Sequence, residues 1–361
     1  MQCQRRGASS LINLSLFITI LALTLGLFCS LPSRPARADD SGGAIWGADY
    51  FPDSVLTSHQ GKKLRFFNDL IKGKVVLINF IYTNCPDACA LETARLREVQ
   101  KILGDRVGRD VFLYSITIDP ERDTPKVLEA YARKFQAGPG WLFLTGKEAD
   151  IAVLRQKFGL YRGAEDKESL AAHNLSQIIG NQATGQWMKV SPFENPYVLA
   201  TELGSWLSNW KEPPQGKRDY TDAPKVRNIS KGEELFRTRC AACHTIGAEA
   251  VAGSKSRPLG PDLLGVTRKR EKGWLARWIK EPDTMLAEKD PLALAQLAAY
   301  NNLSMPNLRL NELEVQALIG FIDEESSRIE SLQHQEHQHH EHHEQHEHHD
   351  HEHQHDEHQH R

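Results

Sequence analysis

The 361-residue sequence predicts an α/β domain followed by an all-α domain and a disordered, histidine-rich tail. As far as residue 210, apolar runs of strand length alternate with segments of helical period. After residue 228 the apolar positions follow a helical period alone. From 331 onward, His, Gln, Glu and Asp make up almost the whole chain, and such a composition cannot form a packed core.

Residues 1–38 are predicted to be an export signal or a membrane anchor. Two arginines at positions 5 and 6 precede an apolar run over 11–28, and Ala-Arg-Ala at 36–38 offers a cleavage site. The apolar run approaches the length of a membrane span, so an uncleaved anchor is the alternative to cleavage. A lipid anchor on Cys29 is disfavoured because bulky Phe28 precedes it. Each alternative places the remaining chain outside the cytoplasm, in the periplasm or on the outer face of the cytoplasmic membrane.

The first domain is predicted to span 44–210, with strands and helices in alternation. Strands are expected at 74–82, 111–118, 141–144, 177–179 and 187–190, the last two joined by a turn at 181–185. Helices are expected from the first cysteine motif to Leu103, over 126–135 and over 196–210. Pro125 immediately precedes the second of these helices, which is a typical start signal.

A linker at 211–228 separates this domain from the second one, because it contains three prolines and no apolar period. The second domain, 229–329, is predicted to contain helices only. They are expected at 232–240, 272–279, 291–300 and 312–329. Asn311 is placed to cap the last helix, whose apolar residues share one face.

The net charge of −3 gives no indication of a nucleic-acid partner. The cysteines are more informative. Two of the six, Cys3 and Cys29, lie in the predicted export signal. The other four form two closely spaced pairs: Cys85 with Cys89, and Cys240 with Cys243.

Cys85 and Cys89 stand where a buried strand meets a helix. On a helix, positions four apart share a face with Cβ atoms about 5–6 Å apart, so the two sulfurs would reach one metal ion or form a disulfide. Pro86 suits the first position of that helix, and a helix N-terminus lowers the pKa of a thiol. Thiolates favour Cu(I), and an added imidazole favours Cu(II) as well. A buried structural disulfide is the alternative. His59 and His173 are the candidate third ligands outside the tail and the second cysteine motif.

Residues 80–89 (Phe-Ile-Tyr-Thr-Asn-Cys-Pro-Asp-Ala-Cys) and 115–125 (Ser-Ile-Thr-Ile-Asp-Pro-Glu-Arg-Asp-Thr-Pro) resemble the Sco/SenC copper-chaperone family over 48–210. The resemblance implies a thioredoxin-like fold. It also implies copper ligands at Cys85, Cys89 and His173, with His59 left on the surface. Two departures, Ala90 for a common proline and Ala172 for a common aspartate, remove no ligand. The second removes a charge beside the site, which bears on partner docking or on the tuning of His173.

The sequence Cys-Ala-Ala-Cys-His at 240–244 is the signature of covalently attached haem c. Cys240 and Cys243 would attach the porphyrin, and His244 would bind the iron. A redox or zinc-binding pair is the alternative. The domain resembles class I cytochromes c, in which a loop like Gly-Pro-Asp-Leu at 260–263 orients the axial histidine. The resemblance places the second axial ligand at Met305, with Met285 left to packing. His/Met ligation suits electron transfer.

The tail holds fourteen of the seventeen histidines, between His334 and His360. Dense imidazoles bind Cu(II), Ni(II) or Zn(II), and acidification would weaken that binding by charging them. A solvated tail without a role is the alternative.

These features favour a copper chaperone of the cell envelope that carries a haem for one-electron transfer. Its partner, by resemblance, is the copper-site subunit of a respiratory cytochrome c oxidase. One alternative is an enzyme, a thiol–disulfide oxidoreductase that uses Cys85 and Cys89 as its redox pair. Another is an electron-transfer cytochrome with a docking domain. Asp119 and Asp123, beside two prolines, are expected to have a structural role in a turn.

Overall fold

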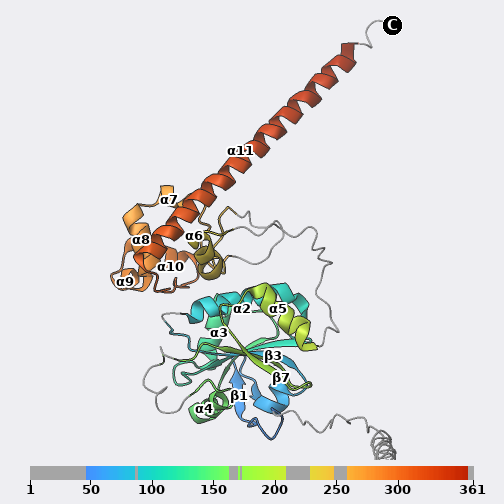
Figure 1. Ribbon diagram of the computed structural model, residues 1–361, viewed down its shortest axis with the longest axis vertical. Coiled ribbons are helices and arrows are strands. Elements are labelled where there is room, and N and C mark those ends of the chain that lie inside the picture. The colour runs from blue at the N-terminus through green and yellow to red at the C-terminus, as the bar shows by residue number, and fades with distance from the viewer. Residues whose placement is uncertain are drawn as a thin grey trace, which may run out of the picture. The chain divides into compact units, whose positions relative to one another are not determined.

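The computed structural model describes residues 46–85, 88–161, 170, 173–208, 228–247 and 258–356, with side chains through 335. The predicted export signal and nearly all of the linker lie outside these residues. Figure 1 shows a sheet with helices in the first domain and helices alone in the second, which confirms the predicted fold class. Within the described part of the chain, no helix is both long enough and apolar enough to cross a lipid bilayer.

Seven strands form one mixed sheet in the first domain. They are β1 (Val55–Ser58), β2 (Lys63–Arg65), β3 (Val75–Ile81), β4 (Val111–Thr117), β5 (Trp141–Thr145), β6 (Gln177–Asn181) and β7 (Gln186–Val190). Their order across the sheet is β2-β1-β5-β4-β3-β6-β7. The central pairs β3–β4 and β4–β5 are parallel, whereas β6 and β1 join the sheet antiparallel, on β3 and β5 respectively. This is the thioredoxin-like arrangement that the resemblance implied.

Helices cover both faces of the sheet. They are the π-helix η1 (Phe66–Ile71), α2 (Cys89–Leu103), the 3₁₀ turn η2 (Gly104–Arg106), α3 (Pro125–Lys134), α4 (Glu148–Lys157), α5 (Pro196–Gly204) and the 3₁₀ turn η5 (Trp206–Ser208). Figure 1 shows α2 and α5 side by side on one face and α4 on the other. Helix α3 starts as predicted, because Thr124 caps it and Pro125 takes its first position.

The strand β3 is the centre of this domain because both of its faces are buried. Leu77 and Ile81 pack with the side chains of α2, whereas Val76, Ile78 and Phe80 pack into the core on the opposite face. Burying each such side chain contributes about 1.5–3 kcal/mol. The same burial explains why the sequence shows an uninterrupted apolar run here instead of alternation. The β1–β2 hairpin and α4 were not predicted.

The second domain contains seven helical elements in the described residues. They are α6 (Lys231–Leu235), which continues as the π-helix η7 (Phe236–Cys240), α7 (Val266–Lys269), α8 (Lys272–Lys280), α9 (Pro282–Ala287), α10 (Pro291–Ala299) and α11 (Glu312–Asp356). The core joins Leu235 of α6, Leu275 and Ile279 of α8, and Val315 and Leu318 of α11. The short helices α7 and α9 were not predicted.

Gly232 lets α6 cross α11 closely. A Cβ at this position would collide with the backbone carbonyl of Ala317, so a larger residue would push the two helices apart. The helix α11 then runs past the packed domain. The sequence predicted disorder from residue 331, but the structure continues α11 to Asp356. Among the α11 side chains that the structure describes, which end at residue 335, the last buried one is Ser326, and those at 331–335 are exposed.

Candidate copper and haem sites

The first cysteine pair lies in the connection from β3 to α2. Cys85 follows the end of β3 and is half-buried, and its backbone N–H donates to the carbonyl of Tyr82 at 3.3 Å. Cys89 is the first residue of α2 and is completely buried. The prediction that both sulfurs share a helical face is therefore wrong, because the helix begins only at the second cysteine. Pro86 lies outside the described residues.

The pKa of the Cys89 thiol is raised, not lowered as the helix start alone would suggest. Its hydrogen bond with the Cys85 thiol is the largest cause, followed by burial and by the nearby Cys85 and Glu92 charges. These effects outweigh the partial positive charge of the helix N-terminus. Cys89 therefore stays protonated at neutral pH until a metal ion displaces the proton.

The buried carboxylate of Asp123 fastens the segment that leads from β3 to Cys85, here called the cysteine loop, to the neighbouring strand β4. The carboxylate of Asp123 accepts hydrogen bonds from the backbone N–H of Thr83 at 3.0 Å, from the Thr83 hydroxyl, and from the Thr117 hydroxyl at 2.6 Å. Thr83 stands two residues before Cys85, and Thr117 is the last residue of β4. The structural role expected for Asp123 is thus to hold the cysteine loop against the end of β4.

Beneath the cysteine pair lies a chain of buried polar side chains that sequence reasoning missed. Oε1 of Glu92 accepts from Nδ2 of Asn79 at 2.9 Å and from Nε2 of Gln177 at 3.0 Å. The hydroxyl of Ser115 donates to Oδ1 of Asn79 at 2.7 Å and accepts from Nε1 of Trp141 at 3.0 Å. The chain links α2 to four adjacent strands of the sheet, including β6, which follows His173.

Glu92 could have been found from helical spacing. It shares a face of α2 with Cys89, Leu96 and Val99, all of which are buried. A carboxyl group on such a face needs partners or a proton. Burial, the largest cause, raises the pKa of Glu92 to about 7, despite the hydrogen bonds from Gln177 and Asn79.

His173 is buried and is held by a backbone carbonyl three residues earlier in the chain and by an aromatic ring. Its Nδ1 lies 2.8 Å from the carbonyl oxygen of Leu170. Because a carbonyl only accepts, Nδ1 carries the proton and Nε2 carries the lone pair that a metal ligand requires. The imidazole packs edge-to-face on Tyr82, with ring centroids 5.5 Å apart. Since the carbonyl of Tyr82 accepts from the Cys85 N–H, the structure brings His173 beside the cysteine loop.

His59 is half-buried instead of lying freely on the surface. Its backbone N–H donates to the carbonyl of Phe143 at 2.8 Å, and its Nδ1 accepts from the N–H of the same residue at 3.2 Å. His59 therefore extends the hydrogen bonding between β1 and β5 by one residue beyond the end of β1. Among the side chains that the structure describes, no group of three or more His, Cys, Asp or Glu residues is gathered closely enough to hold a metal ion. The copper ligand set stays a prediction.

The second cysteine motif opens onto an apolar cavity of about 360 Å³. Cys240 ends η7, and the N–H groups of Cys243 and His244 both donate to its carbonyl, at 3.0 and 2.9 Å. Burial raises the pKa of each thiol to about 12. Met305 also lines the cavity, whereas Met285 is buried in α9 and does not. Two thiols, an imidazole and a thioether on one apolar cavity fit the donor set of haem c.

The imidazole of His244 is oriented by the loop that follows. Its Nδ1 donates to the carbonyl of Pro261 at 2.9 Å, so Nε2 carries the lone pair. Burial lowers the pKa of His244, which keeps the ring neutral. Gly260 lies against the ring, and a Cβ there would be 2.6 Å from Cε1 of His244. The loop resembling that of class I cytochromes c thus holds the histidine as expected.

Comparisons with known proteins match both domains. The SCO1/SenC family model matches residues 47–208, and the Cytochrome c model matches residues 229–325. An SCO2-like protein of Rickettsia felis is 30% identical over 197 residues, which are 52% of this chain and 91% of that protein. This chain belongs to the Sco family.

Solved structures resemble each part of this Sco protein. ScoI of Bradyrhizobium japonicum, with copper bound, is 27% identical and covers 44% of this chain and 96% of its own, with a TM-score of 0.36. The cytochrome c domain of the pp3183 protein from Pseudomonas putida is 55% identical and covers 27% of this chain and 89% of its own, with a TM-score of 0.25. The two family models show that the Sco domain is followed by a cytochrome c domain.

The buried carboxyl group gives the Sco domain a pH-dependent stability. Because the pKa of Glu92 is higher in the folded chain than in the unfolded chain, the folded state binds more protons between about pH 4.5 and 7. The free energy of unfolding should therefore fall as the pH rises through this window, by up to about 3 kcal/mol. Glu92→Gln should make the fall smaller, as measured by urea unfolding between pH 5 and 8. Glu148→Gln, at the exposed start of α4, should keep it; equal slopes in the two variants would contradict the assignment.

Gly260→Ala should impair attachment of haem c, because the added methyl group would occupy the space of the His244 ring. We expect a lower yield of protein with a c-type absorption spectrum after expression with the haem-attachment machinery. Gly320→Ala is the matched control. A Cβ at Gly320 meets nothing within 4 Å, and alanine stabilises a helix interior by about 1 kcal/mol relative to glycine. Normal haem content in Gly260→Ala would contradict the prediction, because it would show that the loop moves to accommodate the added methyl group.

Proposed function

We propose that this Sco protein is a copper chaperone for the copper site of a respiratory cytochrome c oxidase and works outside the cytoplasm. Its copper ligands would be Cys85, Cys89 and His173. The observation that carries the proposal is the tethered imidazole of His173, whose lone-pair nitrogen belongs to a ring packed beside the cysteine loop. Family membership supports the choice of copper and of an oxidase as the recipient.

The chemistry of the cysteine pair supports metal binding. Two sulfurs and one imidazole suit both oxidation states of copper, because thiolates favour Cu(I) and imidazole accommodates Cu(II). The raised pKa of Cys89 means that this sulfur becomes a thiolate only when a cation compensates the buried charge. Copper binding and release would therefore be coupled to release and uptake of a proton at this residue.

The cytochrome c domain supports a one-electron role. Haem c, when bound, supplies a one-electron couple, which matches Cu(II)/Cu(I) and not the two-electron dithiol–disulfide couple. The residues of this domain keep the His244 imidazole neutral and line the cavity mostly with apolar side chains. We propose that the domain either reduces copper held by the Sco domain or passes electrons to the same partner.

A second function, thiol–disulfide exchange with the cysteines of a target protein, is favoured by one observation. Cys85 is half-exposed and Cys89 is fully buried. In such a pair the accessible sulfur attacks the target disulfide and the buried sulfur then resolves the mixed disulfide. His173 has no required part in that exchange, so its substitution separates the two functions.

His173→Ala should weaken Cu(I) binding by more than about 100-fold, the upper bound for loss of a residue that only supports a metal ligand. Competition with a chromophoric Cu(I) chelator would measure the affinity. The rate at which the reduced protein exchanges with a model disulfide should stay nearly unchanged. His59→Ala is the matched control, because this histidine pairs with the backbone of Phe143. Wild-type copper affinity in His173→Ala would refute the proposed ligand set.

The electron-carrier role is tested by mixing Cu(II) with reduced full-length protein and following the haem absorbance. Transfer within one molecule predicts a first-order decay of the reduced spectrum after the metal has bound, at a rate independent of protein concentration. A rate proportional to protein concentration would show transfer between molecules instead. Cys85→Ser provides the control, since it removes a proposed copper ligand and leaves the cytochrome c domain intact.

A further inference from the structure

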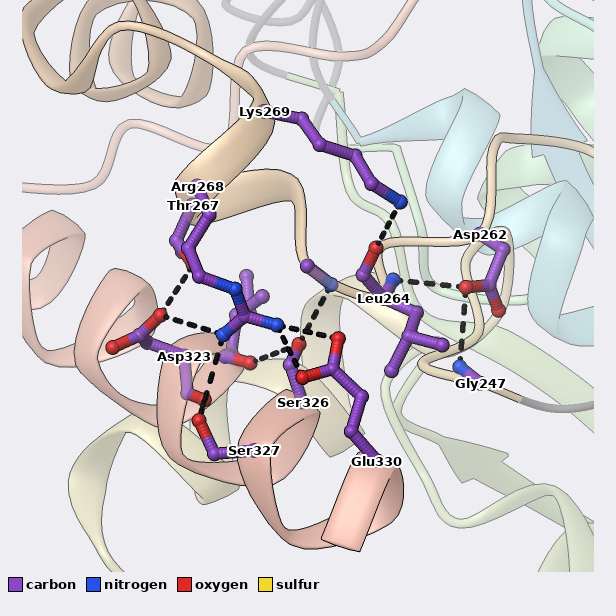
Figure 2. Close-up of polar contacts among 12 residues, drawn as sticks. Gly247, Asp262, Leu264, Thr267, Arg268, Lys269, Asp323, Ser326, Ser327 and Glu330 are labelled. Atoms are coloured by element: carbon purple, nitrogen blue, oxygen red, sulfur yellow. Dashed lines mark hydrogen bonds and ion pairs between the residues drawn. The ribbon is translucent and has the colours of Figure 1, made fainter. Parts of the chain in front are cut away.

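Asp262 follows the residue whose carbonyl orients the haem-binding histidine, and its side chain ties the loop to the opposite segment. Oδ1 accepts from the backbone N–H of Gly247 at 3.1 Å and from that of Leu264 at 2.8 Å. Oδ2 accepts from the hydroxyl of Thr245 at 2.6 Å. Figure 2 shows the carboxylate of Asp262 between Gly247 and Leu264. The exposed side chain of Asp262 therefore connects its own loop to the segment that follows His244.

Backbone hydrogen bonds flank this bridge. The N–H of Gly260 donates to the carbonyl of Cys243 at 2.9 Å, and the N–H of Leu263 donates to the carbonyl of Thr245 at 2.8 Å. The Nδ1–H of His244 donates to Pro261 between these two contacts. The peptide group that accepts from the imidazole joins Pro261 to Asp262, so anchoring the Asp262 side chain restricts rotation of that peptide.

The other end of the loop is fastened to α11. The N–H of Gly265 donates to the hydroxyl of Ser326 at 3.0 Å, and the hydroxyl of Thr267 donates to Asp323. Arg268 forms an ion pair with Glu330 and a longer one, of 3.6 Å, with Asp323. Figure 2 shows these contacts gathered around Arg268. With α7 held in this way, the Asp262 bridge determines how the remaining part of the loop meets His244.

We propose that Asp262 is a positioning residue for the axial histidine of the haem. It holds the Pro261 carbonyl in line with Nδ1 of His244 and so keeps that hydrogen bond strong. When haem is bound, a strong bond at Nδ1 would make the imidazole a better electron donor to iron, which would favour the ferric state. The inference rests on attachment of haem c at Cys240 and Cys243.

The carboxylate of Asp262 also places a negative charge near the haem, which favours the ferric state by electrostatics alone. Two variants separate the effects. Asp262→Asn removes the charge but keeps Oδ1 as an acceptor for the N–H groups of Gly247 and Leu264. Asp262→Ala removes both the charge and the bridge. Thr245→Val removes only the hydroxyl that donates to Oδ2.

The experiment uses the full-length holoprotein and two measurements: the haem midpoint potential by spectroelectrochemistry, and the exchange rate of the His244 Nδ1 proton by NMR of the reduced state. Asp262→Ala should raise the potential more than Asp262→Asn does. It should also speed proton exchange about tenfold, which corresponds to about 1.4 kcal/mol of local stability. Asp262→Asn should leave the exchange rate near that of wild type, and Thr245→Val should fall between the two.

Equal potentials and equal exchange rates in Asp262→Ala and Asp262→Asn would overturn the positioning role and leave only the charge effect. If the alanine variant yields little holoprotein, Asp262→Asn and Thr245→Val still test the role, because each keeps part of the bridge. Wild-type-like exchange in Thr245→Val together with accelerated exchange in Asp262→Asn would then overturn the role. Wild-type protein without a c-type spectrum would overturn the haem assignment itself, which is a different result.

Discussion

Both candidate centres depend on the same interaction, a histidine Nδ1–H donated to a backbone carbonyl of a nearby loop. His173 is held by Leu170 and His244 by Pro261, at 2.8 and 2.9 Å. The bond fixes the tautomer, directs Nε2 away from the loop and keeps the ring from rotating. An imidazole without this restraint would lose conformational freedom each time a metal bound. The loops that carry these carbonyls therefore matter as much as the ligands.

In the Sco domain, buried polar groups connect the surroundings of the cysteine pair and His173 to the sheet. Asp123 fastens the cysteine loop to β4, while Glu92 joins α2 to β3 and, through Gln177, to β6. Such groups are costly to bury, so their partners must lie at defined positions. The helix that starts at Cys89 and the strand that follows His173 are thereby tied to the same sheet. This arrangement orders the surroundings of the two sulfurs and the imidazole.

In the cytochrome c domain, the loop that contains Gly260 and Asp262 holds His244 in place. Gly260 allows the loop to touch the ring, and Asp262 bridges that loop to the segment behind His244. The packing of α11, through Gly232 and the Arg268 ion pairs, anchors the neighbouring elements. Short contacts of this kind leave little room for substitution, which explains why a small residue and a short acid occupy these two positions.

The amino-acid sequence by itself determined the two-domain organisation, both cysteine motifs and most of the regular elements, because these features are local. A run such as β3 shows its burial in its composition, and Cys-x-x-Cys-His carries its spacing within one turn. Tertiary structure alone decided where α2 begins, why the pKa of Cys89 rises, and which groups Glu92 and Asp262 contact. Those properties come from burial and from partners distant in sequence, such as Gln177 for Glu92, and no local pattern records them. The helix start was mispredicted for the same reason: the segment after β3 is held by Asp123, not by its own helical preference.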